Sequence, residues 1–108
     1  MQLQFFTLSP AQAKKFAELK TTEDLAMHGP LALGQTVPVH THTKAALYVV
    51  EGSAAFTDGQ NEQMLGQNSL YNAVLVPEQY PHGWKSLFSG TLIEHTFSSQ
   101  INQVLAAT

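Results

Sequence analysis

The stretch "GQTVPVHTHTKAALYVVEG", residues 34–52, places two histidines one residue apart at the start of an apolar run. In an extended strand, residues i and i+2 point to the same face, so His40 and His42 would direct both imidazoles toward one point. That arrangement can chelate a metal ion, although the same spacing also occurs in surface or core histidines that bind nothing. A second feature is needed to choose between these two interpretations.

The chain after residues 29–30 consists of short apolar segments that alternate with turn-forming residues. Short segments with turns at this spacing are typical of an all-β sandwich or barrel. We expect strands near residues 25–28, 31–35, 37–41, 44–51, 53–57, 62–65, 73–76, 82–87 and 91–97.

The two ends of the chain have a different pattern. The segment "SPAQAKKFAELK", residues 9–20, predicts a short helix with Ser9 as N-cap and Pro10 at the first helical position. Phe16 and Leu19 would be its buried contacts. The tail "SSQINQVLAAT", residues 98–108, is compatible with either a short helix or a loose end. We expect a single domain over residues 1–108, with its barrel core at about 25–97.

Composition excludes several classes of partner. The five basic residues are all lysines and the net charge is −3, which argues against binding to nucleic acid. Cysteine is absent, so any metal must be held by nitrogen and oxygen ligands. The N-terminus lacks the features of a signal peptide and no apolar run is long enough to span a bilayer. We therefore expect no membrane contact and a cytoplasmic location.

The second feature is the stretch "VPEQYPHGWKS", residues 76–86, where a proline-bounded turn precedes His82. Together the two stretches resemble the two motifs of the cupin superfamily. The first motif has a glycine, two histidines one residue apart, a glutamate and a closing glycine; the second has a glycine, a proline, a glycine, a histidine and an asparagine. The matching positions are Gly34, His40, His42 and Gly52 for the first motif and Pro77 and His82 for the second, with Gln79 in place of the glycine and Ser86 in place of the asparagine. The resemblance implies a small antiparallel jelly-roll barrel.

The chain departs from the first motif at its glutamate, which falls at Ala45 or Ala46 depending on the direction of counting. The resemblance therefore implies a three-histidine metal set of His40, His42 and His82. Neutral imidazoles suit iron, zinc, nickel or copper rather than magnesium or calcium. Without a carboxylate the ion keeps its full charge, which favours a small anionic or chelating ligand. The alternative is a barrel that has lost its metal and keeps the histidines as polar interior groups.

Further residues are candidates for the ligand pocket. His95 lies on the Ile93/His95/Phe97 face of the last expected strand, where it would act in acid–base catalysis or be a buried histidine bonded to a carbonyl. We expect Tyr48 on the face opposite to the pocket, as a packing or dimer contact. The expected pocket lining is Gln79, Trp84, Leu47, Val49 and Phe97.

Two classes of function remain open from the sequence. One is a metal-dependent enzyme, either a dioxygenase or an isomerase or lyase, and the other is a non-catalytic module that binds or senses a small molecule. Fold alone does not choose between them. We also expect a homodimer, because only 12% of the residues are charged and a lone barrel would expose apolar or unpaired strand edges, either the N-terminal strand or the sheet carrying Tyr48.

Overall fold

The computed structural model describes residues 2–19 and 26–108, with the backbone alone for residues 98 and 99. Nine strands and two helices follow one another along the described chain. Their bounds are β1 (Gln4–Phe6), α1 (Pro10–Glu18), β2 (Ala26–Leu31), β3 (Thr36–His40), β4 (Ala46–Glu51), β5 (Ser53–Thr57), β6 (Glu62–Gly66), β7 (Ala73–Val76), β8 (His82–Ser86), β9 (Thr91–Phe97) and α2 (Ser98–Leu105).

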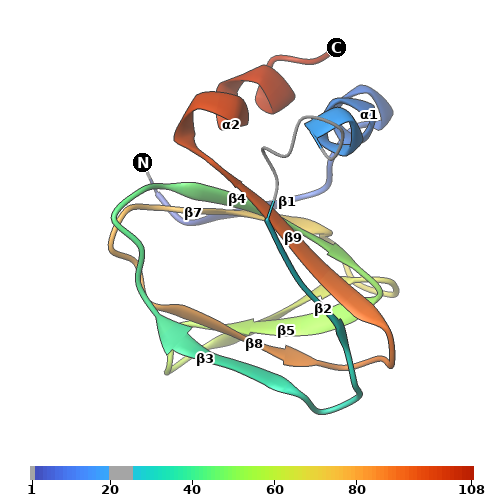
Figure 1. Ribbon diagram of the computed structural model, residues 1–108, viewed down its shortest axis with the longest axis vertical. Coiled ribbons are helices and arrows are strands. Elements are labelled where there is room, and N and C mark those ends of the chain that lie inside the picture. The colour runs from blue at the N-terminus through green and yellow to red at the C-terminus, as the bar shows by residue number, and fades with distance from the viewer. Residues whose placement is uncertain (1, 20–25) are drawn as a thin grey trace.

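The strands form two antiparallel sheets that face each other. One sheet has the order β1-β7-β4-β9-β2 and the other the order β3-β8-β5-β6. Both helices lie on the outer side of the five-stranded sheet, so that this sheet is covered on both faces (Figure 1). The expected all-β antiparallel barrel with a short N-terminal helix is confirmed. Neither described helix is long and apolar enough to cross a membrane.

The first expected strands differ from those observed. The strand predicted at 25–28 extends to Leu31 as β2, whereas residues 32–35 of the segment predicted at 31–35 form a turn, and residue 25 lies outside the described residues. A turn follows β2 because the Gln35 N–H donates to the Ala32 carbonyl, and the Gln35 side chain accepts from the Ala32 N–H. Gly34, with a φ of 84°, adopts the left-handed conformation within this turn.

The helices begin and end as their sequences indicate. Ser9 caps α1 by accepting from the Gln12 N–H, the Gln12 side chain returns a bond to the Ser9 N–H, and Pro10 opens the helix. Phe16 is buried, as expected, and so is Leu19 just after the helix. The C-terminal tail is helical, which decides between the two alternatives left open by the sequence.

Strand β4 is apolar on both faces, and each face packs into a different cluster. Ala46, Tyr48 and Val50 point into the barrel interior, where they meet the side chains of the facing sheet. Leu47 and Val49 point outward beneath the helices. The expectation that Leu47 and Val49 line the pocket is therefore wrong, and so is the outward placement of Tyr48. Because the helices bury the outer face, alternation along β4 cannot distinguish the interior from the exterior.

Candidate metal centre

Three histidines from two adjacent strands and one loop meet at one end of the barrel. His40 is the last residue of β3 and His82 is the first residue of β8, and the two are paired in the antiparallel register. His42 lies beyond the end of β3, in the loop to β4, so the strand periodicity used in the sequence argument does not apply to it. That loop is held in place because the Gln79 N–H donates to the His42 carbonyl over 2.8 Å.

The imidazole nitrogens of these residues lie close enough for one ion. The Nε2 atoms of His40 and His42 are 3.1 Å apart, and one ring nitrogen from each of the three histidines lies within 4.8 Å of the others. Two nitrogens at about 2.0–2.1 Å from a common metal are at most about 4.2 Å apart. The widest pair would therefore need to close by a small side-chain rotation. The cluster is consistent with metal binding.

Backbone carbonyls orient two of the three rings. The His40 Nδ1 lies 2.7 Å from the Pro38 carbonyl, and the His82 Nδ1 lies 2.8 Å from the Tyr80 carbonyl. A carbonyl only accepts, so each Nδ1 must carry the proton and donate it. In the neutral tautomer the Nε2 of each ring is then unprotonated and has a lone pair that can accept a hydrogen bond or bind an ion. This is the arrangement by which proteins commonly fix metal-ligating histidines.

Burial favours the uncharged form of His82 and His42. It lowers the pKa of His82, against a smaller opposing effect of the Tyr80 carbonyl, and the neighbouring histidines lower it further. The pKa of His42 is lowered in the same way, first by burial and then by His40 and His28. Neutral imidazoles are the form that binds a metal, so an ion would not need to displace a proton from them.

Tyr48 also belongs to the cluster, a position that the sequence did not predict. Its hydroxyl lies 2.8 Å from the His82 Nε2, and its side chain is fully buried. Burial also raises the pKa of Tyr48. A signal was available, because Tyr48 follows Ala46 by two residues and therefore shares the strand face on which the motif's glutamate would lie. Ala45 and Ala46 are buried and offer no side-chain oxygen.

His95 lies beside this cluster on β9. Its ring centroid is 4.7 Å from that of Tyr48, 5.1 Å from Phe97 and 6.3 Å from His42, and the ring stacks on His28. The residue is 6% exposed, and its Nδ1 has no hydrogen-bond partner among the described residues. Burial, followed by the nearby histidines, lowers the pKa of His95 to about 4.

The other predicted pocket residues lie in different environments. Phe97 presents its ring to His42 at 5.5 Å, edge to face, and so lines the cluster. Trp84 is buried in the barrel interior, where its ring packs between Tyr48 and Phe56. Gln79 has an exposed side chain, and its contact with the site is made through its backbone.

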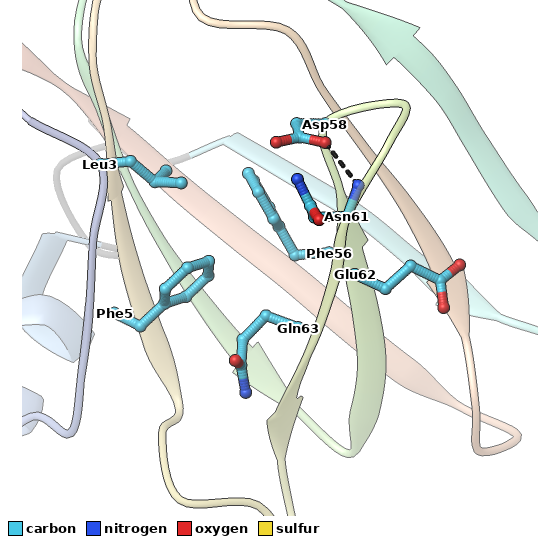
Figure 2. Close-up of a pocket in the computed structure, with 7 residues that line it drawn as sticks. All are labelled: Leu3, Phe5, Phe56, Asp58, Asn61, Glu62 and Gln63. Carbon is cyan, nitrogen blue, oxygen red and sulfur yellow. Dashed lines mark hydrogen bonds between the residues drawn. The ribbon is translucent and has the colours of Figure 1, made fainter.

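A separate pocket of about 160 Å³ lies away from the histidines, and its lining includes none of them. It opens between the N-terminal strand and the β5–β6 hairpin, with Leu3 and Phe5 on one side and Phe56 and Gln63 on the other (Figure 2). Asp58 at its rim accepts hydrogen bonds from the backbone of the hairpin. We place the functional site at the histidine cluster because the converging ring nitrogens lie there.

Comparison with known proteins places this geometry in a structural class. No family model matches the chain, and no curated protein matches its sequence. A solved cupin superfamily protein from Desulfitobacterium hafniense DCB-2 matches 89% of this chain and 77% of its own, with 15% identity and a TM-score of 0.53. KdgF from Halomonas sp. matches 90% of this chain and 78% of its own, with 19% identity and a TM-score of 0.53.

A third solved structure is DMSP lyase DddQ from Ruegeria pomeroyi DSS-3. It matches 69% of this chain with 19% identity and a TM-score of 0.54, and the match spans only 36% of the lyase. Other structural neighbours are RmlC-like cupins and a cupin-2 domain protein. The chain therefore has the cupin fold, as its two motifs indicated. Identities this low show the fold alone, so function must be argued from the site.

Proposed function

We propose that this cupin-fold protein binds one divalent transition-metal ion through the Nε2 atoms of His40, His42 and His82, and a small organic anion at that ion. The observation that carries the proposal is the pair of carbonyl contacts, from Pro38 and Tyr80, that leave Nε2 lone pairs on His40 and His82 facing the cluster. When bound, such an ion supplies Lewis acidity and an anchor for a ligand oxygen or sulfur.

The donor set favours particular ions and ligands. Three neutral imidazoles suit iron, zinc, nickel or copper, and they leave the ion's charge uncompensated. No arginine occurs in the chain to bind a carboxylate by itself. A ligand that brings its own negative charge would therefore be attracted chiefly to the ion.

The proposal is tested by metal analysis of protein purified without added metal, followed by titration of the metal-free protein with zinc. We expect about one ion per chain in the wild type and a loss of affinity of at least about tenfold in His82→Gln. His28→Gln is the matched control, because His28 is half-buried but lies outside the ligand set. Equal zinc affinity in wild type and His82→Gln would contradict the proposal.

The same site supports either catalysis or binding alone. A buried His95 with a lowered pKa is neutral near pH 7, so it would form a hydrogen bond with a ligand beside the ion. Such a group fits either an enzyme, a metal-dependent dioxygenase or a lyase or isomerase, or a sensing module. Ligand-dependent oxygen consumption by the iron-loaded protein would indicate the dioxygenase. Turnover without oxygen would indicate the lyase or isomerase, and ligand binding without turnover the module.

A further inference from the structure

The His82 Nε2 has one lone pair with two potential partners. Because the His82 Nδ1–H donates to the Tyr80 carbonyl, Nε2 is the acceptor and the Tyr48 hydroxyl, 2.8 Å away, is the donor. A metal ion on the same nitrogen would use the same lone pair. The Tyr48 hydroxyl and the ion therefore compete for His82.

Tyr48 needs another acceptor whenever His82 binds an ion. Its side chain is fully buried between His82, His95 and Trp84, so bulk water cannot satisfy the hydroxyl. A buried hydroxyl without a partner destabilises the folded state. Burial also raises the pKa of Tyr48, so the phenol stays a neutral donor near pH 7. The new acceptor would then be an atom of a ligand that is bound to the ion.

A second buried polar atom without a partner belongs to a ring next to Tyr48. The His95 Nδ1 is buried without a partner among the described residues, and its ring lies 4.7 Å from that of Tyr48, its cross-strand neighbour. A buried ring nitrogen in this position calls for a hydrogen bond from outside the protein's own side chains. A ligand at the ion could therefore satisfy two protein groups at once.

We propose that Tyr48 is a ligand-selecting residue: it donates its hydrogen bond to a small carboxylate held by the metal ion, while His95 bonds a hydroxyl or keto oxygen next to that carboxylate. This inference rests on the proposed metal site. It names the ligand class as small 2-hydroxy or 2-keto acids, which present an anionic oxygen and an adjacent polar oxygen on a compact skeleton.

The test uses cobalt(II) as the ion and compares lactate with propionate, which differ by one hydroxyl. We expect Tyr48→Phe to bind cobalt at least as tightly as wild type, because the competing hydroxyl is gone. We expect the cobalt-loaded variant to bind lactate about five- to tenfold more weakly, because one hydrogen bond is lost. Wild type should also prefer lactate over propionate. Tyr71→Phe, which removes a phenol that stacks on Phe5, is the matched control.

If Tyr48 selects the ligand, Tyr48→Phe keeps or gains affinity for cobalt and loses affinity for lactate. If Tyr48 is only structural, both affinities change in the same direction. If Tyr48→Phe loses cobalt and lactate affinity together, or changes neither, the inference is overturned. Equal affinity of wild type for lactate and propionate overturns the assignment of the ligand class. A wild type that binds neither cobalt nor zinc overturns the proposed function itself, whereas metal binding without the Tyr48 effect overturns only this inference.

A second measurement covers the case in which Tyr48→Phe fails to fold. Incorporation of 3-fluorotyrosine keeps the ring and the hydroxyl, and its fluorine resonance reports on the surroundings of the phenol. We expect the resonance of residue 48 to shift when diamagnetic zinc is added and to shift again when lactate follows. A resonance that zinc moves but lactate does not would overturn the inference.

Discussion

At the scale of single residues, the site is defined by which nitrogen of each imidazole carries a proton. Carbonyl acceptors at Pro38 and Tyr80 decide this for His40 and His82, and burial keeps His82 neutral. His95 shares the burial but has no partner for its Nδ1 among the described residues. The two kinds of histidine thus differ by one hydrogen bond, which separates a proposed metal ligand from a group available to a bound molecule.

The lowered pKa of His95 predicts how stability depends on pH in the metal-free protein. In the unfolded chain this group titrates near 6.5, and in the folded chain near 4, so the unfolded state binds more protons between these values. The free energy of unfolding should therefore fall as the pH drops from about 6.5 to about 4, by up to about 3 kcal/mol from this residue.

Urea denaturation in EDTA at several pH values measures this effect. His28, His42 and His82 also have lowered pKa values and add to the same slope. His95→Gln removes one titrating group and should make the dependence shallower, although not flat. A slope identical to that of wild type would show that His95 is not held neutral by the fold.

At the scale of elements, the turn between β7 and β8 positions the histidine loop. Gln79 has a φ of 60°, a left-handed conformation that is unfavourable for a residue with a side chain, and its N–H holds the His42 carbonyl. This is also the position at which the second cupin motif has a glycine. The chain therefore keeps the backbone shape that the motif encodes without the residue that adopts it most easily.

Substitution at this turn should affect stability through the backbone alone. We expect Gln79→Gly to raise the free energy of unfolding by up to about 1 kcal/mol, and Gln79→Val to lower it by about 1–2 kcal/mol because a β-branched residue is strained at positive φ. Gln79→Ala is the control for the exposed side chain and should bind zinc as wild type does. Loss of zinc binding in Gln79→Ala would instead indicate that the Gln79 side chain is a metal ligand.

At the scale of the whole molecule, the two sheets leave four edge strands, β1 and β2 in one sheet and β3 and β6 in the other. Met64 on β6 and Met27 on β2 are about half exposed. The sequence suggested Tyr48 as a dimer contact, but its side chain is buried inside the barrel and cannot contact a second copy. The edges remain as surfaces on which a second copy could pair, since exposed edges readily associate.

We propose a homodimer. The N-terminal strand β1, the expected interface, is one of the four edges, and the half-exposed Met64 makes the β6 edge the one to test first. Light scattering at micromolar concentration should then give twice the mass of the chain. Met64→Lys should shift the protein toward monomer, because a charged side chain on an edge opposes pairing. Met27→Lys on the β2 edge is the matched control and should stay dimeric. A monomeric wild type at this concentration would rule the dimer out, and dissociation by Met27→Lys alone would move the interface to β2.

The sequence by itself determined the fold class and the candidate ligands. Turn spacing indicated an all-β chain, Ser9 and Pro10 marked the start of α1, and two motifs in the right order selected His40, His42 and His82. Each of these signals can be recognised in the sequence because it depends on residues that lie near one another in the chain.

Only the tertiary structure decided which groups surround those histidines. Both faces of β4 are apolar, because helices cover one and the facing sheet covers the other, so the sequence pattern could not place Tyr48 inside and Leu47 outside. The Tyr48–His82 bond joins residues 34 positions apart, and the stacking of His95 on His28 joins two strands from opposite ends of the barrel sequence. The first contact arises from the packing of the two sheets against each other and the second from the pairing of β2 with β9, and no local spacing encodes either.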